Sequence, residues 1–273
     1  MKVRVITAAV LLIVLVPVVI LGDLFLDIAL ALLSMGATYE LFKMYKADKF
    51  EFNAVLVIEV ILSAGVFFST AFYLKGNLEL EYLFVLILFI MVITGIVLVF
   101  EDDFTSEDFG RLLVSVLYPS IGFAVISWLR DIDLYNIGFL FMITIFTDVF
   151  AYIFGINFGK HRLAVKISPK KSIEGSIGGT LAALFLTLLY IYLLDINEVG
   201  EINLNIWISI LLIVFISIVG QIGDLIASKL KRGNNIKDFS QLFPGHGGVM
   251  DRFDSVIFAG ITLVLISKVV GLL

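Results

Sequence analysis

The chain of 273 residues contains no cysteine, only two histidines and few charges. The absence of cysteine excludes disulfides, thiolate nucleophiles, zinc ribbons and iron–sulfur clusters, and two histidines are too few for a histidine-rich metal site. Charged residues make up 16% of the chain, against about 25% in a soluble domain. Hydrophobic residues make up 60%, and no water-soluble fold buries so much apolar surface, because surface-to-volume scaling forces many side chains outward. The solvent for most of this chain must therefore be lipid.

Nine apolar runs are long enough to cross a bilayer, since a membrane helix needs about 20 apolar residues for a hydrocarbon core about 30 Å thick. The first run follows Lys2 and Arg4 like a signal peptide, but it lacks a convincing cleavage site and turns at Gly22-Asp23 into the next run. We therefore interpret it as a retained anchor and predict an all-α, polytopic membrane protein. The predicted spans are 3–22, 24–43, 53–73, 80–100, 110–130, 134–155, 173–194, 204–230 and 252–272.

The distribution of basic residues predicts the orientation. Nine spans place the two termini on opposite sides of the membrane. All 19 lysines and arginines except Lys75, Arg130 and Lys268 then fall on the side of the N-terminus. Under the positive-inside rule that side is the cytoplasm. We therefore predict a multi-pass protein of the cell membrane with a cytoplasmic N-terminus, an external C-terminus and a site facing the cytoplasm.

Four aspartates stand at membrane depth in the second half of the chain. Asp148 lies inside the sixth predicted span, Asp224 lies inside the eighth, and Asp251 and Asp254 open the ninth. A bare carboxylate in lipid is costly, so such a group faces the bundle interior with a partner. That partner is either a bound cation or a lysine or arginine in a structural ion pair, and the residues alone leave both open.

Helical spacing gathers several of these groups. Asp224, Ser228 and Lys231 recur at i, i+4 and i+7, on one stripe of the eighth span. Asp251 and Asp254, three residues apart, share one face of the ninth. Carboxylates that converge with basic residues and a glycine-rich turn are what a phosphate–metal–protein site requires, and oxygen ligands suit Mg²⁺.

The segment between the last two spans reads KDFSQLFPGHGG over 237–248. Pro244 ends any helix, while Gly245, Gly247 and Gly248 permit tight turns and close approach of backbone N–H groups to an anion. The start of the ninth helix then adds the positive end of its dipole. This segment is therefore a candidate phosphate site.

The segment between the sixth and seventh spans is a second candidate. It reads SPKKSIEGSIGG over 168–179 and is not a P-loop, because it lacks the G-x4-G-K-[ST] pattern between a strand and a helix. Ser172 is expected to cap the seventh helix, with the glycines after it permitting close helix contact. Lys170 and Lys171 lie beside that helix end, where they form either an anion site or a topology signal.

These motifs together resemble the phosphatidate cytidylyltransferase (CDP-diacylglycerol synthase) family. The runs that carry the resemblance are SKLKR over 228–232, KD over 237–238, FP over 243–244, HGG over 246–248 and DRFD over 251–254. The run ISPKKSIEG over 167–175 is also similar, with Ser172 where the family more often has threonine. The resemblance covers about 145–255 by motif; the first five spans match only in length, hydropathy and the basic N-terminus.

The resemblance implies a Mg²⁺-dependent transfer of a cytidylyl group from CTP to phosphatidic acid, carried out by a nucleotidyltransferase in membrane lipid, with no nucleic acid as partner. It implies one or two divalent ions, held by Asp224 and Asp251, with Asp148 and Asp254 as further ligands or as supports of the ligands. His246 would either donate a hydrogen bond to phosphate or lock the turn. The implied catalytic residues are Asp224, Lys231, Arg232, Asp251 and Arg252, and the implied substrate-binding residues are Lys170, Lys171, Ser228, Lys229, Lys237, Asp238, His246, Gly247 and Gly248.

Residues 1–130 are expected to form a scaffold of five spans that faces lipid, and residues 131–273 the catalytic region. Small residues in several spans would permit a homodimer. Three alternatives stay open: a CTP-dependent lipid kinase, which would release CDP; a cytidylyltransferase for ether-linked lipid phosphates; and a transporter. A transporter usually shows inverted repeats with paired interruptions, whereas the polar motifs here cluster in one half of the chain.

Overall fold

The computed structural model describes residues 2–45, 54–102 and 104–272, and the chain divides into two compact units. Unit 1 comprises Met1–Asp131 and Gly233–Arg252, and unit 2 comprises Ile132–Arg232 and Phe253–Leu273. The division runs through the last two helices of the chain. The segment between these helices therefore belongs with the N-terminal helices in unit 1.

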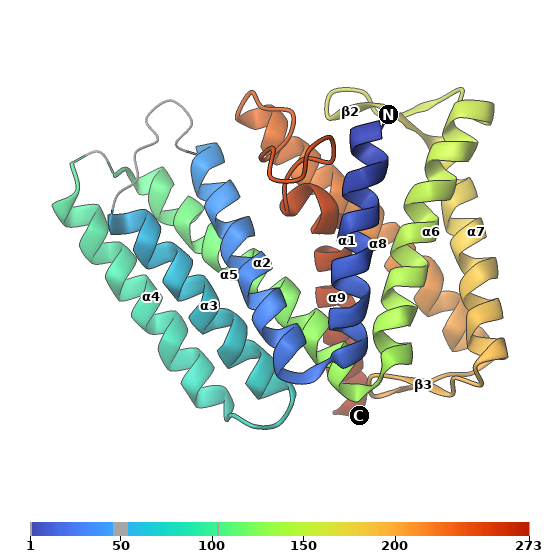
Figure 1. Ribbon diagram of the computed structural model, residues 1–273, viewed down its shortest axis with the longest axis horizontal. Helices are drawn as coiled ribbons and strands as arrows, with labels where there is room; N and C mark the ends of the chain where they lie inside the picture. Colours follow the sequence, from blue (N-terminus) through green and yellow to red (C-terminus); the bar gives the residue numbers. More distant parts are fainter. Residues whose placement is uncertain (1, 46–53, 103, 273) are drawn as a thin grey trace. The chain divides into compact units, whose positions relative to one another are not determined.

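Unit 1 contains the first five helices, with α2, α3, α4 and α5 side by side (Figure 1). Gly22 and Asp23 separate the first two with φ of 67° and 44°, so the turn predicted there is confirmed. The helices are α1 (Lys2–Leu21), α2 (Asp23–Tyr45), α3 (Ala54–Leu74), α4 (Leu80–Phe100) and α5 (Ser106–Ile132).

Unit 2 contains the remaining helices and two short hairpins. α6 and α7 pack side by side (Figure 1), and one hairpin precedes α7 while the other follows it. The elements are α6 (Leu134–Phe158), β1 (Arg162–Ala164), β2 (Ser168–Ser172), α7 (Ile173–Leu193), β3 (Glu198–Val199), β4 (Ile202–Asn203), α8 (Ile206–Gly233) and α9 (Met250–Gly271).

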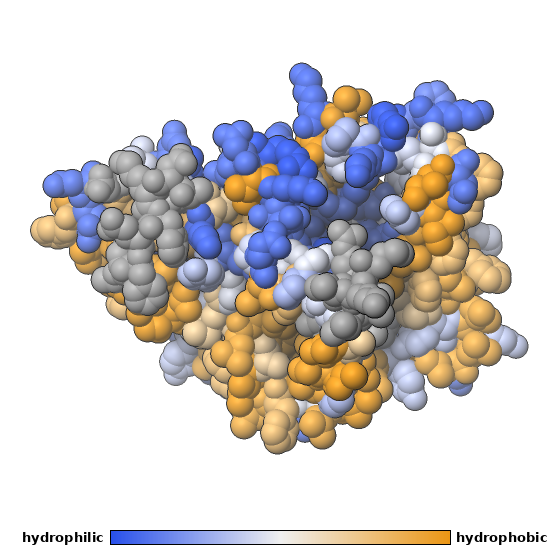
Figure 2. Space-filling view, turned by 45° about the horizontal axis from the view of Figure 1, so that its top comes forward, coloured by the Kyte–Doolittle hydropathy of each residue, from blue (hydrophilic) through white to orange (hydrophobic). Residues whose placement is uncertain are grey.

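The prediction of an all-helical membrane protein is confirmed. Each of the nine predicted spans is a helix in the part of the chain that the structure describes, and α2 to α9 are long and apolar enough to cross a membrane. In both units hydrophobic residues cover the flanks of the helices and hydrophilic residues gather at their ends and in the connections (Figure 2). This is the surface that a lipid solvent demands, because the hydrocarbon core offers no partner to a polar group.

The two hairpins were not predicted. β1 pairs with β2 in antiparallel fashion, with Arg162 opposite Ser172, and β3 pairs with β4, with Val199 opposite Ile202. Strands of two to five residues are too short to show an alternating pattern. They lie between spans, where the chain is polar and no apolar run marks an element.

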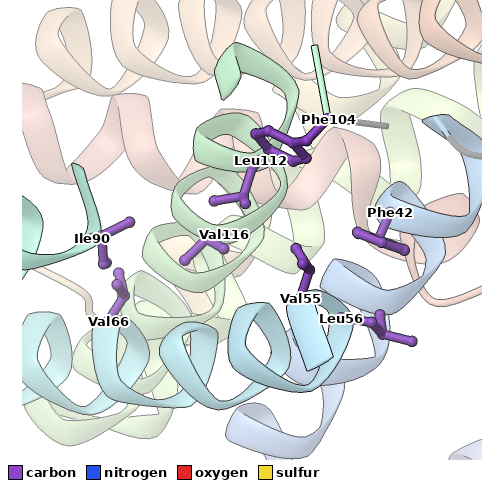
Figure 3. Close-up of a cluster of buried hydrophobic side chains, with 8 residues drawn as sticks. All are labelled: Phe42, Val55, Leu56, Val66, Ile90, Phe104, Leu112 and Val116. Carbon is purple, nitrogen blue, oxygen red and sulfur yellow. The ribbon is translucent and has the colours of Figure 1, made fainter. Parts of the chain in front are cut away.

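The core of unit 1 is a cluster of buried apolar side chains from α2, α3, α4 and α5 and from the segment before α5 (Figure 3). Because lipid is as apolar as these side chains, their stabilisation comes from close packing and not from escape from water. The cluster comprises Phe42, Val55, Leu56, Val66, Ile90, Phe104, Leu112 and Val116.

A buried ion pair ties α2 to the end of α3. Lys75 Nζ donates to both carboxylate oxygens of Asp27, at 3.1 and 2.9 Å, and lies 3.5 Å from Asp131. Ser127 Oγ donates to the same Asp27 carboxylate. Both partners of the pair keep only 8% of their side-chain surface exposed. Removing either partner would therefore leave the other charge buried and only partly compensated, by Ser127 for Asp27 or by Asp131 for Lys75.

We expect Lys75→Met to lower the stability of the protein by about 3–5 kcal/mol, the usual cost of breaking a buried ion pair from one side. The measurement is the unfolding temperature in detergent micelles. Lys268→Met is the control, because its pair with Glu201 is more than a third exposed on both sides and should change little. Adding Asp27→Leu to Lys75→Met should recover most of the loss; an unchanged unfolding temperature for Lys75→Met would contradict the expectation.

Candidate active site

Unit 2 brings together carboxylates from α6, α8 and α9. Ser255 Oγ lies within hydrogen-bonding distance of Asp148 Oδ2, at 3.1 Å, and of Asp254 Oδ1, at 3.3 Å. The backbone N–H of Ser255 donates to Asp254 Oδ1 at 2.8 Å. Asp254 also interacts electrostatically with Asp224, Asp148 and Lys231. Asp148, Asp224 and Asp254, hereafter the aspartate set, are therefore close enough to influence one another.

The members of the aspartate set differ in exposure. Asp254 is buried, Asp224 keeps 26% of its side-chain surface exposed, and Asp148 is exposed. An ionised carboxylate facing hydrocarbon is unfavourable, and intramembrane carboxylates face a bundle interior or a water-filled cavity. The exposed side of Asp148 is therefore expected to meet water or a polar ligand.

Glycines on α8 allow the helices of unit 2 to approach closely beside the aspartate set. A Cβ added at Gly223 would lie 2.7 Å from the Asp254 carbonyl oxygen and from Phe258 Cβ on α9. A Cβ at Gly220 would lie 3.7 Å from Thr144 on α6 and from Ala259 on α9. The small residue at 223 thus sets the spacing of α8 and α9 at the depth of the acidic groups.

Asp224 is held by two neighbours. Ser228 Oγ donates to Asp224 Oδ1 at 3.3 Å, as their i, i+4 spacing on α8 predicts. Lys171, near the end of β2, forms an ion pair with Asp224 Oδ2. The ammonium group already balances the charge of Asp224, as a metal cation would.

The hairpin β1–β2 positions Lys171 through the start of α7. Ser172 Oγ accepts the backbone N–H of Gly175 at 3.1 Å, so the predicted helix cap is confirmed. Glu174 accepts the backbone N–H groups of Lys160 and His161, at 3.0 and 3.1 Å, and pairs with His161 Nδ1 at 2.6 Å. These hydrogen bonds hold the hairpin against the start of α7. They therefore fix the position on β2 from which the Lys171 side chain extends.

The glycines after Ser172 permit close helix contact, as predicted. A Cβ at Gly175 would lie 2.6 Å from the carbonyl oxygen of Ala151, and a Cβ at Gly179 would lie 2.5 Å from that of Thr147. Both carbonyls belong to α6. The predicted close contact of the seventh helix is therefore confirmed as a contact with α6, on the segment that also carries Asp148.

The other predicted residues of unit 2 differ in their surroundings. Lys231 is buried, with 8% of its surface exposed, and it interacts with Asp254. Lys170, Lys229 and Arg232 are exposed at the ends of β2 and α8. A buried lysine beside carboxylates neutralises charge in place, whereas the exposed basic side chains are in contact with the surroundings of the protein.

In unit 1 the remaining predicted residues lie on or beside one loop, residues 234–249, hereafter the signature loop. Asp251 Oδ2 accepts the backbone N–H groups of Phe239 and Gly248, each at 2.9 Å. The N–H of Gly248 is thus bonded to Asp251, and Asp251 ties the middle of the loop to its C-terminal end. Lys237, Asp238 and Arg252 are exposed.

The tip of the signature loop is a tight turn. Phe243 N–H donates to the Gly247 carbonyl at 2.9 Å, and His246 N–H donates to the Phe243 carbonyl at 2.8 Å. Gly245 and Gly247 have φ of 76° and 84°, which only glycine adopts without strain. Nδ1 of His246 is buried and has no hydrogen-bond partner within the described ranges. Backbone bonds, and not this ring nitrogen, therefore close the turn.

One residue that holds the signature loop was missed. Glu40 on α2 accepts the backbone N–H groups of Val249 and Met250, at 2.8 and 2.9 Å, and the hydroxyl of Ser240 at 2.6 Å. It lies inside the second predicted span, so the rule that marked the four aspartates would also have marked it.

The donor chemistry of the aspartate set fits Mg²⁺, which prefers carboxylate oxygens and usually keeps waters and substrate phosphates among its ligands. Among the described residues, no three carboxylate or imidazole side chains are grouped so that they could hold a metal ion alone. A site of one or two carboxylates completed by phosphate oxygens remains compatible with this arrangement. Asp148, Asp224 and Asp254 are the candidate ligands within unit 2, and Asp251 is a candidate ligand within unit 1.

Comparison with known proteins gives matches along almost the whole chain. The model of the cytidylyltransferase family matches residues 2–270. A phosphatidate cytidylyltransferase of Staphylococcus haemolyticus (strain JCSC1435) is 35% identical over 264 residues, which cover 94% of this chain and 95% of that protein. Similar proteins of the same name from Staphylococcus aureus (strain COL) and Staphylococcus epidermidis (strain ATCC 12228 / FDA PCI 1200) are 36% and 34% identical, with the same coverage.

Proposed function

This chain belongs to the cytidylyltransferase family, and on that premise we propose that it transfers a cytidylyl group from CTP to phosphatidic acid, giving CDP-diacylglycerol and pyrophosphate. The relatives that carry the name of this activity are similar over 94% of the chain, so the likeness covers both units. The observation that supports the chemistry is the aspartate set of unit 2 with Lys171 and Lys231 beside it. Acidic and basic groups gathered in this way suit the binding of a polyphosphate with a divalent cation.

The reaction forms one bond and breaks one. A phosphate oxygen of phosphatidate attacks the α-phosphorus of CTP, and the bond from that phosphorus to the bridging oxygen of the β-phosphate breaks, so pyrophosphate leaves with the electron pair. The attacking phosphomonoester is already anionic near neutral pH, so no general base and no covalent enzyme intermediate are needed. The protein's task is to align the two phosphates and to offset their charge.

We assign the charge-offsetting role to the basic residues around the two loops. Lys231, Arg232, Lys237 and Arg252 would bind the triphosphate and the leaving pyrophosphate, and Lys170 and Lys171 would bind the phosphate of the lipid. Nδ1 of His246 has no hydrogen-bond partner among the described residues, which supports a role of this ring in ligand binding over a role in closing the turn. Ser228 would stay a partner of Asp224, since no base accompanies it.

We propose Mg²⁺ as the cofactor, held through Asp224 and Asp251, with Asp148 and Asp254 as further ligands or as supports of the ligands. When bound, such an ion polarises the phosphoryl oxygens and offsets the charge that develops on the pyrophosphate. The carboxylates supply the oxygen donors that this ion prefers. Ser255 supports the assignment, because it orients the carboxylates of Asp148 and Asp254 from one position.

We further propose that the enzyme lies in the cell membrane with its N-terminus in the cytoplasm. CTP is a highly charged cytosolic molecule that cannot enter lipid, whereas phosphatidate stays in the leaflet. A site at the cytoplasmic ends of the helices would serve both. The segregation of lysine and arginine supports this orientation.

The test is a transfer assay with purified protein, Mg²⁺, diacyl phosphatidate and CTP labelled at the α-phosphate. We expect the label to enter the lipid phase and one pyrophosphate to be released for each lipid converted. Removal of divalent ions with EDTA should stop the reaction, and excess Mg²⁺ should restore it, because the triphosphate charge would otherwise be unscreened.

Each alternative gives a different result in the same assay. A lipid kinase would release CDP and leave the α-label in water. An enzyme for ether lipids would prefer the ether-linked phosphate when both lipids are offered. A transporter would release no pyrophosphate, and this outcome would refute the proposal.

A further inference from the structure

Glu40 is a buried carboxylate whose hydrogen-bond partners lie 200 to 210 positions away in the sequence. It keeps 2% of its surface exposed, within α2, and its hydrogen-bond partners in the described part of the chain are Ser240, Val249 and Met250. Burying an ionised group is costly unless it is fully hydrogen-bonded. The bonds that compensate this carboxylate all come from the signature loop and the start of α9.

The bonds of Glu40 satisfy groups that the loop cannot satisfy by itself. Val249 and Met250 stand at the start of α9, where the first N–H groups of a helix lack partners within the helix. A carboxylate at this end is also favoured by the helix dipole. Ser240, which donates to Glu40, accepts the backbone N–H of Leu242 at 3.1 Å, so Glu40 fixes the loop at its middle and at its C-terminal end.

The absence of a side chain at Gly248 leaves space for the Glu40 carboxylate. A Cβ added at Gly248 would collide with the Glu40 carboxylate. The φ of Gly248 is not in the left-handed region, so the missing side chain is required by space and not by backbone conformation. The N–H of Gly248 is bonded to Asp251. The close contact with the Glu40 carboxylate therefore explains the second glycine of the HGG run without any direct contact to an anion.

Glu40 and Asp251 together hold one loop. Asp251 accepts two N–H groups of the signature loop, and Glu40 accepts the Ser240 hydroxyl in the middle of the loop and two N–H groups where the loop meets α9. The two carboxylates also interact with each other electrostatically. The segment that they hold carries Lys237 and His246, so any shift of the loop moves groups that we assign to the nucleotide.

We infer that Glu40 is a positioning residue for the reaction, which holds the signature loop in the shape needed for nucleotide binding and requires glycine at position 248. This inference rests on the proposed function for its catalytic meaning. The N-terminal helices of unit 1 would then be more than a lipid-facing scaffold, because α2 supplies a group on which the shape of the loop depends.

The test compares Glu40→Gln, Glu40→Ala and the control Glu59→Gln, in full-length protein purified as a monodisperse species. Gln is isosteric, but its NH₂ group must face at least one of the three donors, so it loses a hydrogen bond without leaving a cavity. Glu59 on α3 is equally buried, at 1% exposed, and belongs to the same unit. The two readouts are hydrogen exchange of the peptide over 240–252 and turnover per folded molecule with saturating CTP and phosphatidate.

We expect both Glu40 variants to exchange faster in this peptide and to lose turnover by about 100-fold, the effect of a displacement of about 1 Å remote from the chemistry. Glu59→Gln should change neither quantity. Gly248→Ala should lower turnover in the wild-type background and add no further loss to Glu40→Ala, where the carboxylate is gone. If Glu40→Ala does not fold, the isosteric Gln variant decides.

Unchanged exchange, or full turnover per folded Glu40→Gln molecule, would overturn the inference. Failure of the proposed function has a different signature, because the wild-type protein itself would then give no CTP-dependent lipid product. In that case the exchange measurement still decides whether Glu40 holds the loop.

Discussion

Asp224→Asn is expected to lower the release of pyrophosphate from CTP by more than about 1,000-fold, since a lost metal ligand removes several kcal/mol of transition-state stabilisation and 1.36 kcal/mol is tenfold in rate. Asparagine keeps an oxygen for the hydroxyl of Ser228, so the local shape of α8 should survive. The substitution removes the negative charge of Asp224, which balances Lys171 and which the proposed cation requires. The measurement is the transfer assay, with the amount of folded protein in the membrane determined in parallel.

Asp195→Asn is the matched control for this variant. Asp195 is exposed beyond the far end of α7 in the same unit, with φ of 51°, a conformation that asparagine tolerates. It should retain full activity. Wild-type turnover by Asp224→Asn would contradict the metal assignment.

A double variant tests whether the ion pair of Asp224 and Lys171 also stabilises the fold. Asp224→Asn leaves the Lys171 ammonium without this partner and should lower the unfolding temperature, and adding Lys171→Met should restore it, because replacing both partners of an ion pair is often neutral. The double variant should still lack activity, since Lys171 is assigned to the lipid phosphate and Asp224 to the metal. Full turnover by the double variant would remove both residues from the proposed site.

Asp251→Asn is expected to lose activity as completely as Asp251→Ala, although the two variants should differ in structure. Asparagine can present its amide oxygen to the N–H groups of Phe239 and Gly248 and keep the signature loop closed, whereas alanine cannot. An equal loss of more than about 1,000-fold in both would mean that the charge is essential, as it is for a metal ligand. Hydrogen exchange over 240–252 should be fast only in the alanine variant.

The opposite outcome is equally informative. If Asp251→Asn keeps turnover and only Asp251→Ala loses it, then Asp251 acts by closing the loop and is not a ligand. Asp254 would then be the stronger candidate on α9, because it is buried and shares Ser255 with Asp148.

The spans could be predicted because, in lipid, whether a segment forms a helix depends mainly on the residues of that segment. A chain in hydrocarbon must satisfy each backbone N–H and C=O group within the segment, so an apolar run of about 20 residues is sufficient to predict a helix. The turn at Gly22-Asp23 and the cap at Ser172 were predicted for the same reason, since each depends on residues within a few positions. The hairpin that presents Lys171 was missed, because its strands are too short to carry a pattern.

The aspartates could be singled out from the sequence, but not their partners. A carboxylate at membrane depth is conspicuous because of its cost. That Asp148 shares Ser255 with Asp254, over a separation of 107 positions, follows from the close packing of α6, α8 and α9 and from no local pattern. The same holds for Glu40, whose partners lie 200 to 210 positions away.

Residue order sets the solvent of this protein, the helices that cross it and the family to which it belongs, because hydropathy and a long gapped motif can be followed along the chain. The contacts between distant residues depend on the fold: Lys171 neutralises Asp224, Asp251 closes the loop that it follows, and Glu40 secures that loop from α2. The physical reason is that a hydrogen bond or an ion pair depends on distances of about 3 Å between atoms, and for residues far apart in the chain these distances are set by helix packing.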